Sequence, residues 1–476
     1  MRRTRLAAAA AVVALATALV PAVATATSTP TTAAAPTEHT GEIEGARFRV
    51  VVPDDWNGTL LLFSHGYFPA HFGDFFPDPL PVFLANNPVS EQWFADHGYA
   101  LAASGFQEGG LGYTLGETVD DQLRVLDWFE DNVGTPEVTV AVGQSMGGNT
   151  AVRLAEREPD RIDGVLGLSA AFDPVSIWDS SLDMQVAIRT LLMDPDDPVE
   201  LVEASDPDAS AAALAQAVVE ARTTEEGRAR LALVASLYNV TGWYGAFEPR
   251  PGTLEEWIIG QSHWLHDAYV LGHGPQDRAD VEGYLGGNPS TNVGVDYRDL
   301  LRRSSERRTV EAAYRAARKA GADVDLRADL RALDEAPRIE ADPGARAAMR
   351  SHVPQASVRA PVLTLHTTGD GGAPPAEVRS FSEAVRRSGG DVRNLYVERG
   401  AHISTSAAEE ILAVKALERR IATGHWPSLS PPVLNRRAGA MDPALFAVFD
   451  VGGAVSHPMP PAFTRFVPAR TPRSSF

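Results

Sequence analysis

Short apolar runs alternate with longer amphipathic segments along most of this chain. The apolar runs are rich in Val, Leu and Ala and predict strands at residues 47–52, 60–63, 99–104, 138–142, 165–168, 362–366 and 395–397. Between them, apolar residues recur every three or four positions, which predicts helices at residues 119–129, 146–157, 375–388 and 411–421. Strands that alternate with helices indicate βαβ units and a mostly parallel sheet.

The alternation stops after Asp173 and resumes at Pro361. Residues 174–355 show mainly helical patterns with Gly- and Pro-containing joints, and they contain no convincing strand. The economical interpretation is an α/β core, at 41–173 and 356–476, interrupted by a helical insertion at 174–355. The Pro- and Arg-rich end of the core, from about Trp426, is predicted to wrap the surface.

The N-terminus predicts the compartment. Arg2, Arg3 and Arg5 precede an apolar run at 6–20 and a stretch of small residues, which is typical of a secretory signal peptide at 1–26. The run is too short and too rich in alanine for a membrane-spanning helix. We therefore expect a secreted, extracellular protein without stable membrane insertion; the Arg2-Arg3 pair leaves the Sec and twin-arginine routes open. Residues 27–40 are mostly Thr, Ala and Pro and predict a disordered leader.

Composition narrows the chemistry. The 62 acidic and 42 basic residues give a net charge of -20, which repels phosphate backbones and argues against a nucleic-acid partner. The chain has no cysteine, so disulfides, thiolate metal sites and cysteine nucleophiles are excluded. Catalysis by this protein needs a different nucleophile, and no cofactor or metal is implied.

A candidate nucleophile lies in the segment Gly143-Gln144-Ser145-Met146-Gly147, which fits the motif G-x-S-x-G. The segment follows a predicted strand and precedes a predicted helix, which is the context this motif requires. The serine then sits on a tight turn above the sheet edge. Side chains at Gly143 and Gly147 would collide with neighbouring backbone, which explains the two glycines.

A serine nucleophile needs a base, and the base needs an orienting carboxylate. Asp370 follows a predicted strand in a Gly-rich turn, and His402 follows the last predicted strand, so the order is Ser, acid, His. Asp173 is a rival acid because it also follows a strand. The Thr-Thr-Gly-Asp turn and the prolines after it favour Asp370.

On these residues the sequence resembles the α/β-hydrolase superfamily, and within it secreted bacterial esterase-type hydrolases. The resemblance covers about 41–173 and 356–425. It implies a mostly parallel α/β-hydrolase sheet flanked by helices, with a large helical cap or lid inserted after the sixth core strand. It also implies a catalytic triad in which Ser145 is the nucleophile, Asp370 the acid and His402 the base.

The chain lacks the HGGG oxyanion signature of one large lipase group. Its Ser64-His65-Gly66-Tyr67 segment is similar to the His-Gly-x turn of other members. That resemblance implies an oxyanion hole made of the backbone N–H groups of Met146 and Tyr67. Loss of one such donor typically lowers the rate about 10²- to 10³-fold.

The sequence thus predicts a serine hydrolase that cleaves a carboxylic ester, small or polymeric, through an acyl-enzyme. An amide or peptide bond is the first alternative; hydrolytic carbon–carbon cleavage and a non-catalytic binding protein are others.

Two further patterns have competing interpretations. His263, His266 and His273 are expected to serve helix packing instead of a metal site, and Phe68, Phe72, Phe75 and Phe76 either line an apolar acyl or aryl pocket or pack beneath the cap.

Overall fold

The computed structural model describes residues 36–72, 80–450 and 455–476. The predicted signal peptide at 1–26 and residues 27–35 of the predicted leader lie outside the described residues.

A nine-stranded sheet forms the centre of the protein, with the strand order β1-β2-β4-β3-β5-β6-β7-β8-β11. The strands from β3 to β8 pair in parallel, whereas β1, β2 and β11 pair antiparallel with their neighbours. The predicted mostly parallel sheet is therefore confirmed. The strands are β1 (Thr37–Ile43), β2 (Ala46–Val52), β3 (Thr59–Ser64), β4 (Ala100–Ser104), β5 (Val138–Gln144), β6 (Gly164–Leu168), β7 (Val362–Gly369), β8 (Val392–Gly400) and β11 (Phe463–Thr464).

The predicted leader at 27–40 is wrong for its last residues, because β1 begins at Thr37. The strand forms a hairpin with β2 in which Thr37 lies opposite Val52 and Ile43 opposite Ala46. The two turn residues, Glu44 and Gly45, have φ values of 50° and 90°, as a tight hairpin turn requires. Most β1 side chains are exposed, so the strand is held through its backbone and carries no buried pattern in the sequence.

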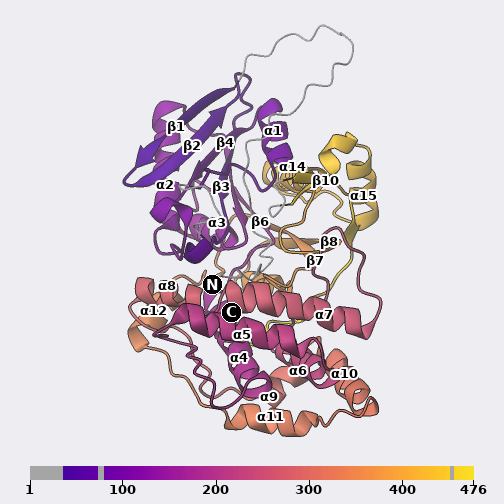
Figure 1. Ribbon diagram of the computed structural model, residues 1–476. Coiled ribbons are helices and arrows are strands. Elements are labelled where there is room, and N and C mark those ends of the chain that lie inside the picture. Colours follow the sequence, from indigo (N-terminus) through magenta and orange to yellow (C-terminus); the bar gives the residue numbers. More distant parts are fainter. Residues whose placement is uncertain (1–35, 73–79, 451–454) are drawn as a thin grey trace, which may run out of the picture.

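Helices cover both faces of the sheet (Figure 1). Leu60 and Leu62 pack in one apolar cluster with α2, α3 and α13, and Leu61 and Phe63 pack in another with α1, α14 and α15. This alternation follows from the two-residue period of a strand. The helices are α1 (Pro88–Asp96), α2 (Thr118–Asn132), α3 (Gly147–Arg157), α13 (Ala376–Arg387), α14 (Ala407–Thr423) and α15 (Pro431–Gly439), with short 3₁₀ turns η1 (Ala70–Phe72), η2 (Glu108–Gly110) and η4 (Pro443–Phe446).

The chain between β6 and β7 is helical, and every residue of it is described. Figure 1 shows these helices gathered at one end of the sheet domain, where all of them except α8 and α12 share an apolar cluster of their own. They occupy the range predicted for the insertion, and their function as a cap stays a prediction. They are α4 (Pro174–Leu192), α5 (Pro207–Ala221), α6 (Glu225–Ser236), α7 (Leu254–Trp264), the π-helix η3 (Leu265–Leu271), α8 (Pro275–Leu285), α9 (Tyr297–Arg303), α10 (Arg307–Lys319), α11 (Leu326–Glu335) and α12 (Pro343–Ser351). Among all described helices, none has the length and apolar character needed to cross a bilayer.

The C-terminal part does more than wrap the surface. After β9 (Ala447–Asp450) and β10 (Val455–Pro458), β11 extends the sheet beside β8. The ring of Phe476 then packs against Phe381 of α13, with 5.6 Å between their centroids. The same tail reaches α4 of the helical insertion through Arg473.

Candidate active site

Ser145 lies on the sharp turn between β5 and α3. Its φ of 51° is in the left-handed region, which a residue with a side chain adopts only when its surroundings hold it there. The Ser145 N–H donates to the carbonyl of Leu168 on β6 at 3.0 Å, and its own carbonyl accepts from Gly148 at 2.9 Å. These bonds fix the turn on both sides of the serine.

The predicted steric role of the motif glycines is confirmed. A Cβ on Gly143 would lie 2.0 Å from the carbonyl oxygen of Gly147, and a Cβ on Gly147 would lie 2.0 Å from that of Ser64. Neither position has room for a side chain. Gly66, after β3, is also close: its Cβ would lie 2.9 Å from the Ser145 Cβ. The loop after β3 therefore lies directly against the turn that carries Ser145.

The structure brings Ser145, His402 and Asp370 into one hydrogen-bonded chain. The Ser145 Oγ is 2.9 Å from His402 Nε2, and His402 Nδ1 is 2.8 Å from Asp370 Oδ2. A carboxylate only accepts, so Nδ1 carries the proton and Nε2 is free to accept from the serine. The neighbours of His402, Ala401 and Ile403, have φ values of 64° and 63°, so the histidine loop also holds an unusual backbone.

Asp370 is fully buried directly after β7. Its Oδ1 accepts backbone N–H groups from Gly372 at 3.0 Å and Ala373 at 2.8 Å. Burial alone would raise the pKa of Asp370, but the charge and hydrogen bonds of His402 and His366 outweigh burial and lower the pKa to about 2. The group is therefore an ionised acceptor with a fixed orientation at any pH near neutrality.

The two acids considered from the sequence accept hydrogen bonds from different groups. Asp173 is buried, but its Oδ1 accepts the N–H of Ser176 at 3.0 Å and caps α4. Its Oδ2 accepts the N–H of Ser475 at 2.6 Å. The carboxylate that reaches His402 is that of Asp370.

Met146 and Tyr67, the two residues expected to form the oxyanion hole, line the same cavity as Ser145. Neither backbone N–H donates a hydrogen bond to another described residue. His65 stiffens this loop, because its Nδ1 donates to the carbonyl of Gly66 at 2.7 Å and its ring packs on Phe106. Burial lowers the pKa of His65, so the ring is neutral.

Ser145 and His402 open into a cavity of about 350 Å³. Its walls come from both the sheet domain and the helical insertion, and no Lys or Arg is among the described residues that line it. Of the four predicted aromatic residues, Phe68 lines the cavity; the side chains of Phe72, Phe75 and Phe76 lie outside what the structure describes. The apolar lining residues are Tyr67, Phe68, Pro69, Tyr113, Leu115, Met146, Ala171, Pro174, Ile177, Trp178, Trp264, Ala268, Ala373 and Ile403.

Of the three histidines of the insertion, His263 and His273 pack against aromatic rings, and His266 contacts a carboxylate. His263 lies against Tyr244 at 5.1 Å, His266 is 2.5 Å from the Asp267 carboxylate, and His273 packs on Trp178. Burial lowers the pKa of His273 to about 4, so this cavity-lining ring is neutral. Within the described part of the chain, no group of three or more His, Asp or Glu side chains is placed to hold a metal ion.

Comparison with known proteins agrees with this geometry. A family model of the alpha/beta hydrolase fold matches residues 83–197, which include β4 to β6 and the Ser145 turn. The chain has the α/β-hydrolase fold. It is 27% identical to the o-phthalyl amidase of Xanthobacter agilis over 444 residues, which is 87% of this chain and 93% of the relative. The superfamily fold and this relative make the chain a hydrolase.

Similar solved structures are more remote. One is an acylaminoacyl peptidase from Pyrococcus horikoshii, with a TM-score of 0.38 and 12% identity; the alignment covers 84% of this chain and 44% of that longer one. Another is a thermophilic esterase from Thermogutta terrifontis, with a TM-score of 0.36 and 15% identity, covering 82% of this chain and 100% of the esterase. Similarities this weak carry no argument about the reaction.

Proposed function

We propose that the protein is a serine hydrolase that transfers an acyl group to water through an acyl-enzyme. The observation that carries this proposal is the hydrogen-bonded chain from Ser145 through His402 to Asp370, opening into an apolar cavity. Ser145 is the nucleophile, His402 the general base and acid, and Asp370 the group that orients His402.

The reaction proceeds in two halves. His402 Nε2 accepts the Ser145 proton while Oγ attacks the carbonyl carbon, and Asp370 stabilises the imidazolium that forms. The N–H groups of Met146 and Tyr67 are the expected donors to the oxyanion. His402 then protonates the leaving group, the bond between the acyl carbon and that group breaks, and the acyl group stays on Ser145 as an ester. In the second half His402 deprotonates water, which attacks the acyl-enzyme and releases the acid and the free serine.

The scissile bond is an amide or an ester. The sequence pattern placed the carboxylic ester first, and the triad serves both bonds because His402 can protonate either leaving group. The amidase relative, of which the chain covers 93%, favours the amide as the natural bond. We keep the ester as the second candidate and as the convenient assay substrate, since an alkoxide or phenoxide is a better leaving group than an amide anion and depends less on protonation by His402.

The cavity supports a small, uncharged acyl group as the substrate part that binds beside Ser145. Its described lining is mostly apolar and aromatic, and the acidic residue in that lining is Asp267. A carboxylate placed there would lose its hydration without gaining a cationic partner, which is costly.

We further propose that the protein is exported, on the basis of the charge and apolar pattern of its first 26 residues.

Labelling with a fluorophosphonate tests the proposal. The reagent should modify Ser145, identified by peptide mass spectrometry, and should not modify Ser145→Ala or a heat-unfolded sample. If the folded wild-type protein is not labelled, the proposal that it is a serine hydrolase is wrong. Benzoyl p-nitroanilide and p-nitrophenyl benzoate share one acyl group, so their kcat/KM values then compare the amide with the ester directly.

A further inference from the structure

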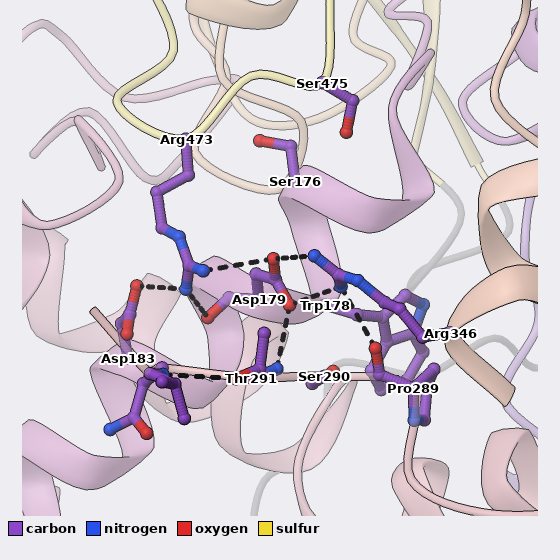
Figure 2. Close-up of polar contacts among 12 residues, drawn as sticks. Ser176, Trp178, Asp179, Asp183, Pro289, Ser290, Thr291, Arg346, Arg473 and Ser475 are labelled. Carbon is purple, nitrogen blue, oxygen red and sulfur yellow. Dashed lines mark hydrogen bonds and ion pairs between the residues drawn. The ribbon is translucent and has the colours of Figure 1, made fainter. Parts of the chain in front are cut away.

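Arg473, close to the C-terminus of the chain, forms ion pairs with the first half of helix α4 (Figure 2). Its Nη1 lies 2.9 Å from Asp183 Oδ2, and its Nη2 lies 3.2 Å from Asp179 Oδ2. Asp179 and Asp183 are four residues apart and therefore lie on the same face of α4. One guanidinium thus bridges two successive turns of the helix.

Asp179 is also held from two other elements (Figure 2). Arg346 of α12 binds both of its carboxylate oxygens, at 2.7 and 2.8 Å, and the N–H of Thr291 donates to Oδ1 at 3.1 Å. The Asp179 side chain is only 3% exposed. Because buried charges of this kind depend on their partners, the position of Asp179 is closely specified.

The residue before Asp179 forms part of the substrate cavity. Trp178 lines that cavity together with Ile177 and Pro174 of the same helix. Its indole packs against His273 at 5.1 Å on one side, and the guanidinium of Arg278 lies 5.3 Å from its ring. The first two turns of α4 therefore present residues to the cavity and carboxylates to the ion-pair cluster behind it.

Asp183 depends on the tail more than Asp179 does. Its side chain is fully buried, and Arg473 is its ion-pair partner; its other side-chain bond is a 3.3 Å contact from the Tyr297 hydroxyl. Asp179 would keep Arg346 if Arg473 were removed, but Asp183 would be left as a buried carboxylate without a cation. Such a group must take up a proton or move toward water, and either response loosens α4 at the turn after Trp178.

We propose that Arg473 is a positioning residue for the substrate cavity. By holding Asp179 and Asp183 it fixes the α4 turns that carry Ile177 and Trp178, and so it sets the fit of bulky acyl groups. The C-terminal tail is then part of the specificity apparatus although it does not touch the substrate. This inference rests on the proposed function, in which the cavity beside Ser145 receives the acyl group.

The test compares Arg473→Gln with a matched control in the same tail. Arg470 is 69% exposed and pairs with Glu383 of α13 on the sheet domain, so Arg470→Gln removes a tail arginine without touching α4. Arg473→Gln should lower kcat/KM for p-nitrophenyl benzoate about tenfold, mainly through KM, and change it less than about threefold for p-nitrophenyl acetate. Arg470→Gln should leave both values unchanged. Arg473→Lys keeps a cation beside Asp183 and should recover part of the benzoate loss.

Hydrogen exchange of the peptide covering α4 gives a readout that needs no turnover. Exchange in residues 174–192 should rise in Arg473→Gln and not in Arg470→Gln. Unchanged exchange, or an equal loss of kcat/KM for both esters, would overturn the positioning role. If wild-type protein is not labelled by fluorophosphonate while α4 still loosens in Arg473→Gln, the failure belongs to the proposed reaction and not to the ion-pair cluster.

Discussion

Asp370 and Asp173 are both buried aspartates just after core strands, yet their carboxylates accept from different groups. Asp370 accepts from His402 Nδ1 and two backbone N–H groups, whereas Asp173 accepts from two backbone N–H groups, one on α4 and one in the tail. Substitution of the two aspartates should therefore have very different effects on kcat.

Asp370→Asn should lower kcat by about 10⁴, because an amide no longer fixes the His402 tautomer that accepts the serine proton. Asp173→Asn keeps an oxygen to cap α4 and should retain kcat within about threefold, with a stability loss of about 1 kcal/mol. Steady-state kinetics and urea unfolding of both variants measure this. A large fall in kcat for folded Asp173→Asn alone would reassign the acid.

The charge of the cavity predicts selectivity among acyl groups. Asp267 lines the cavity, no described lining residue is Lys or Arg, and burial lowers the pKa of His273 to about 4. We expect kcat/KM for benzoyl p-nitroanilide to exceed that for 2-carboxybenzoyl p-nitroanilide at least tenfold at pH 7.5, because the carboxylate is desolvated without a cation. The methyl ester of the second substrate has similar size without the charge, so it should recover activity. Faster cleavage of the carboxylated substrate would contradict this prediction and would indicate a preference for the o-phthalyl group that the name of the amidase relative gives.

At the scale of elements, the loop after β3 is in close contact with the turn after β5, and Gly66 lies at the point of contact. A Cβ there would lie 2.9 Å from the Ser145 Cβ and 3.4 Å from the Gln144 carbonyl oxygen. Gly66→Ala should push the loop and the Tyr67 N–H away from Ser145 and lower kcat about 10²-fold, the typical loss for one oxyanion donor. Gly283→Ala on α8 is the control, since its Cβ would have no neighbour within 4 Å, and it should leave kcat unchanged. Normal kcat in Gly66→Ala would remove Tyr67 from the oxyanion hole.

Elements with a local signal could be predicted, and elements held by distant contacts could not. The run at 60–63 is buried on both faces as β3, and the Gly143 and Gly147 pattern needs only its own turn and the strand beside it. In contrast, β1 could not be predicted, because its exposed side chains show no apolar pattern and the strand forms through backbone pairing with β2. The strand β11 has two residues, too few for any period.

Apart from Phe68, most of the aromatic lining of the cavity could not be predicted, for a related reason. Tyr113, Trp178 and Trp264 line it from three separate segments that tertiary packing brings together. The one available signal was the position of Trp178, ten residues after β6 ends at Leu168, since ligands in parallel sheets gather beyond the carboxyl ends of strands. The local turn around Asp370 favoured it over Asp173 in the sequence, but the strand order alone places both aspartates at that edge.

The whole molecule carries several carboxyl groups that burial keeps protonated near neutrality. Burial raises the pKa of Glu377 to about 8, and the nearby charge of Asp173 adds to the effect. Burial also raises the pKa of Asp277 and Glu410 to about 7. These groups lie on α13, α8 and α14, so both the sheet domain and the helical insertion contain them. Folding therefore takes up protons from solution.

The sign of the pH dependence follows. Each such group stabilises the fold fully below the pKa of its unfolded form, and that contribution is lost as pH rises through the folded pKa of about 7 to 8. The buried histidines His273 and His352, with pKa lowered to about 4, act in the opposite direction, but only while the unfolded imidazole still binds protons. In the interval from pH 7.5 to 8.5 an unfolded imidazole, with a pKa of about 6.5, is almost fully deprotonated, so the pH dependence of stability there reports mainly on the carboxyl groups.

We expect the free energy of unfolding to fall as pH rises from 7.5 to 8.5, by about 1.4 kcal/mol per pH unit for each proton that unfolding releases. Urea unfolding followed by tryptophan fluorescence at fixed ionic strength measures the slope. Glu377→Gln imitates the protonated group, because its amide can donate to the Tyr238 hydroxyl while its oxygen accepts the Phe172 N–H, and it should flatten the slope by up to one proton. Glu340→Gln changes an exposed carboxylate and should leave the slope as in the wild type. A free energy of unfolding that rises across this interval would show that these carboxyl groups are ionised inside the folded protein and that their neighbours offset the burial.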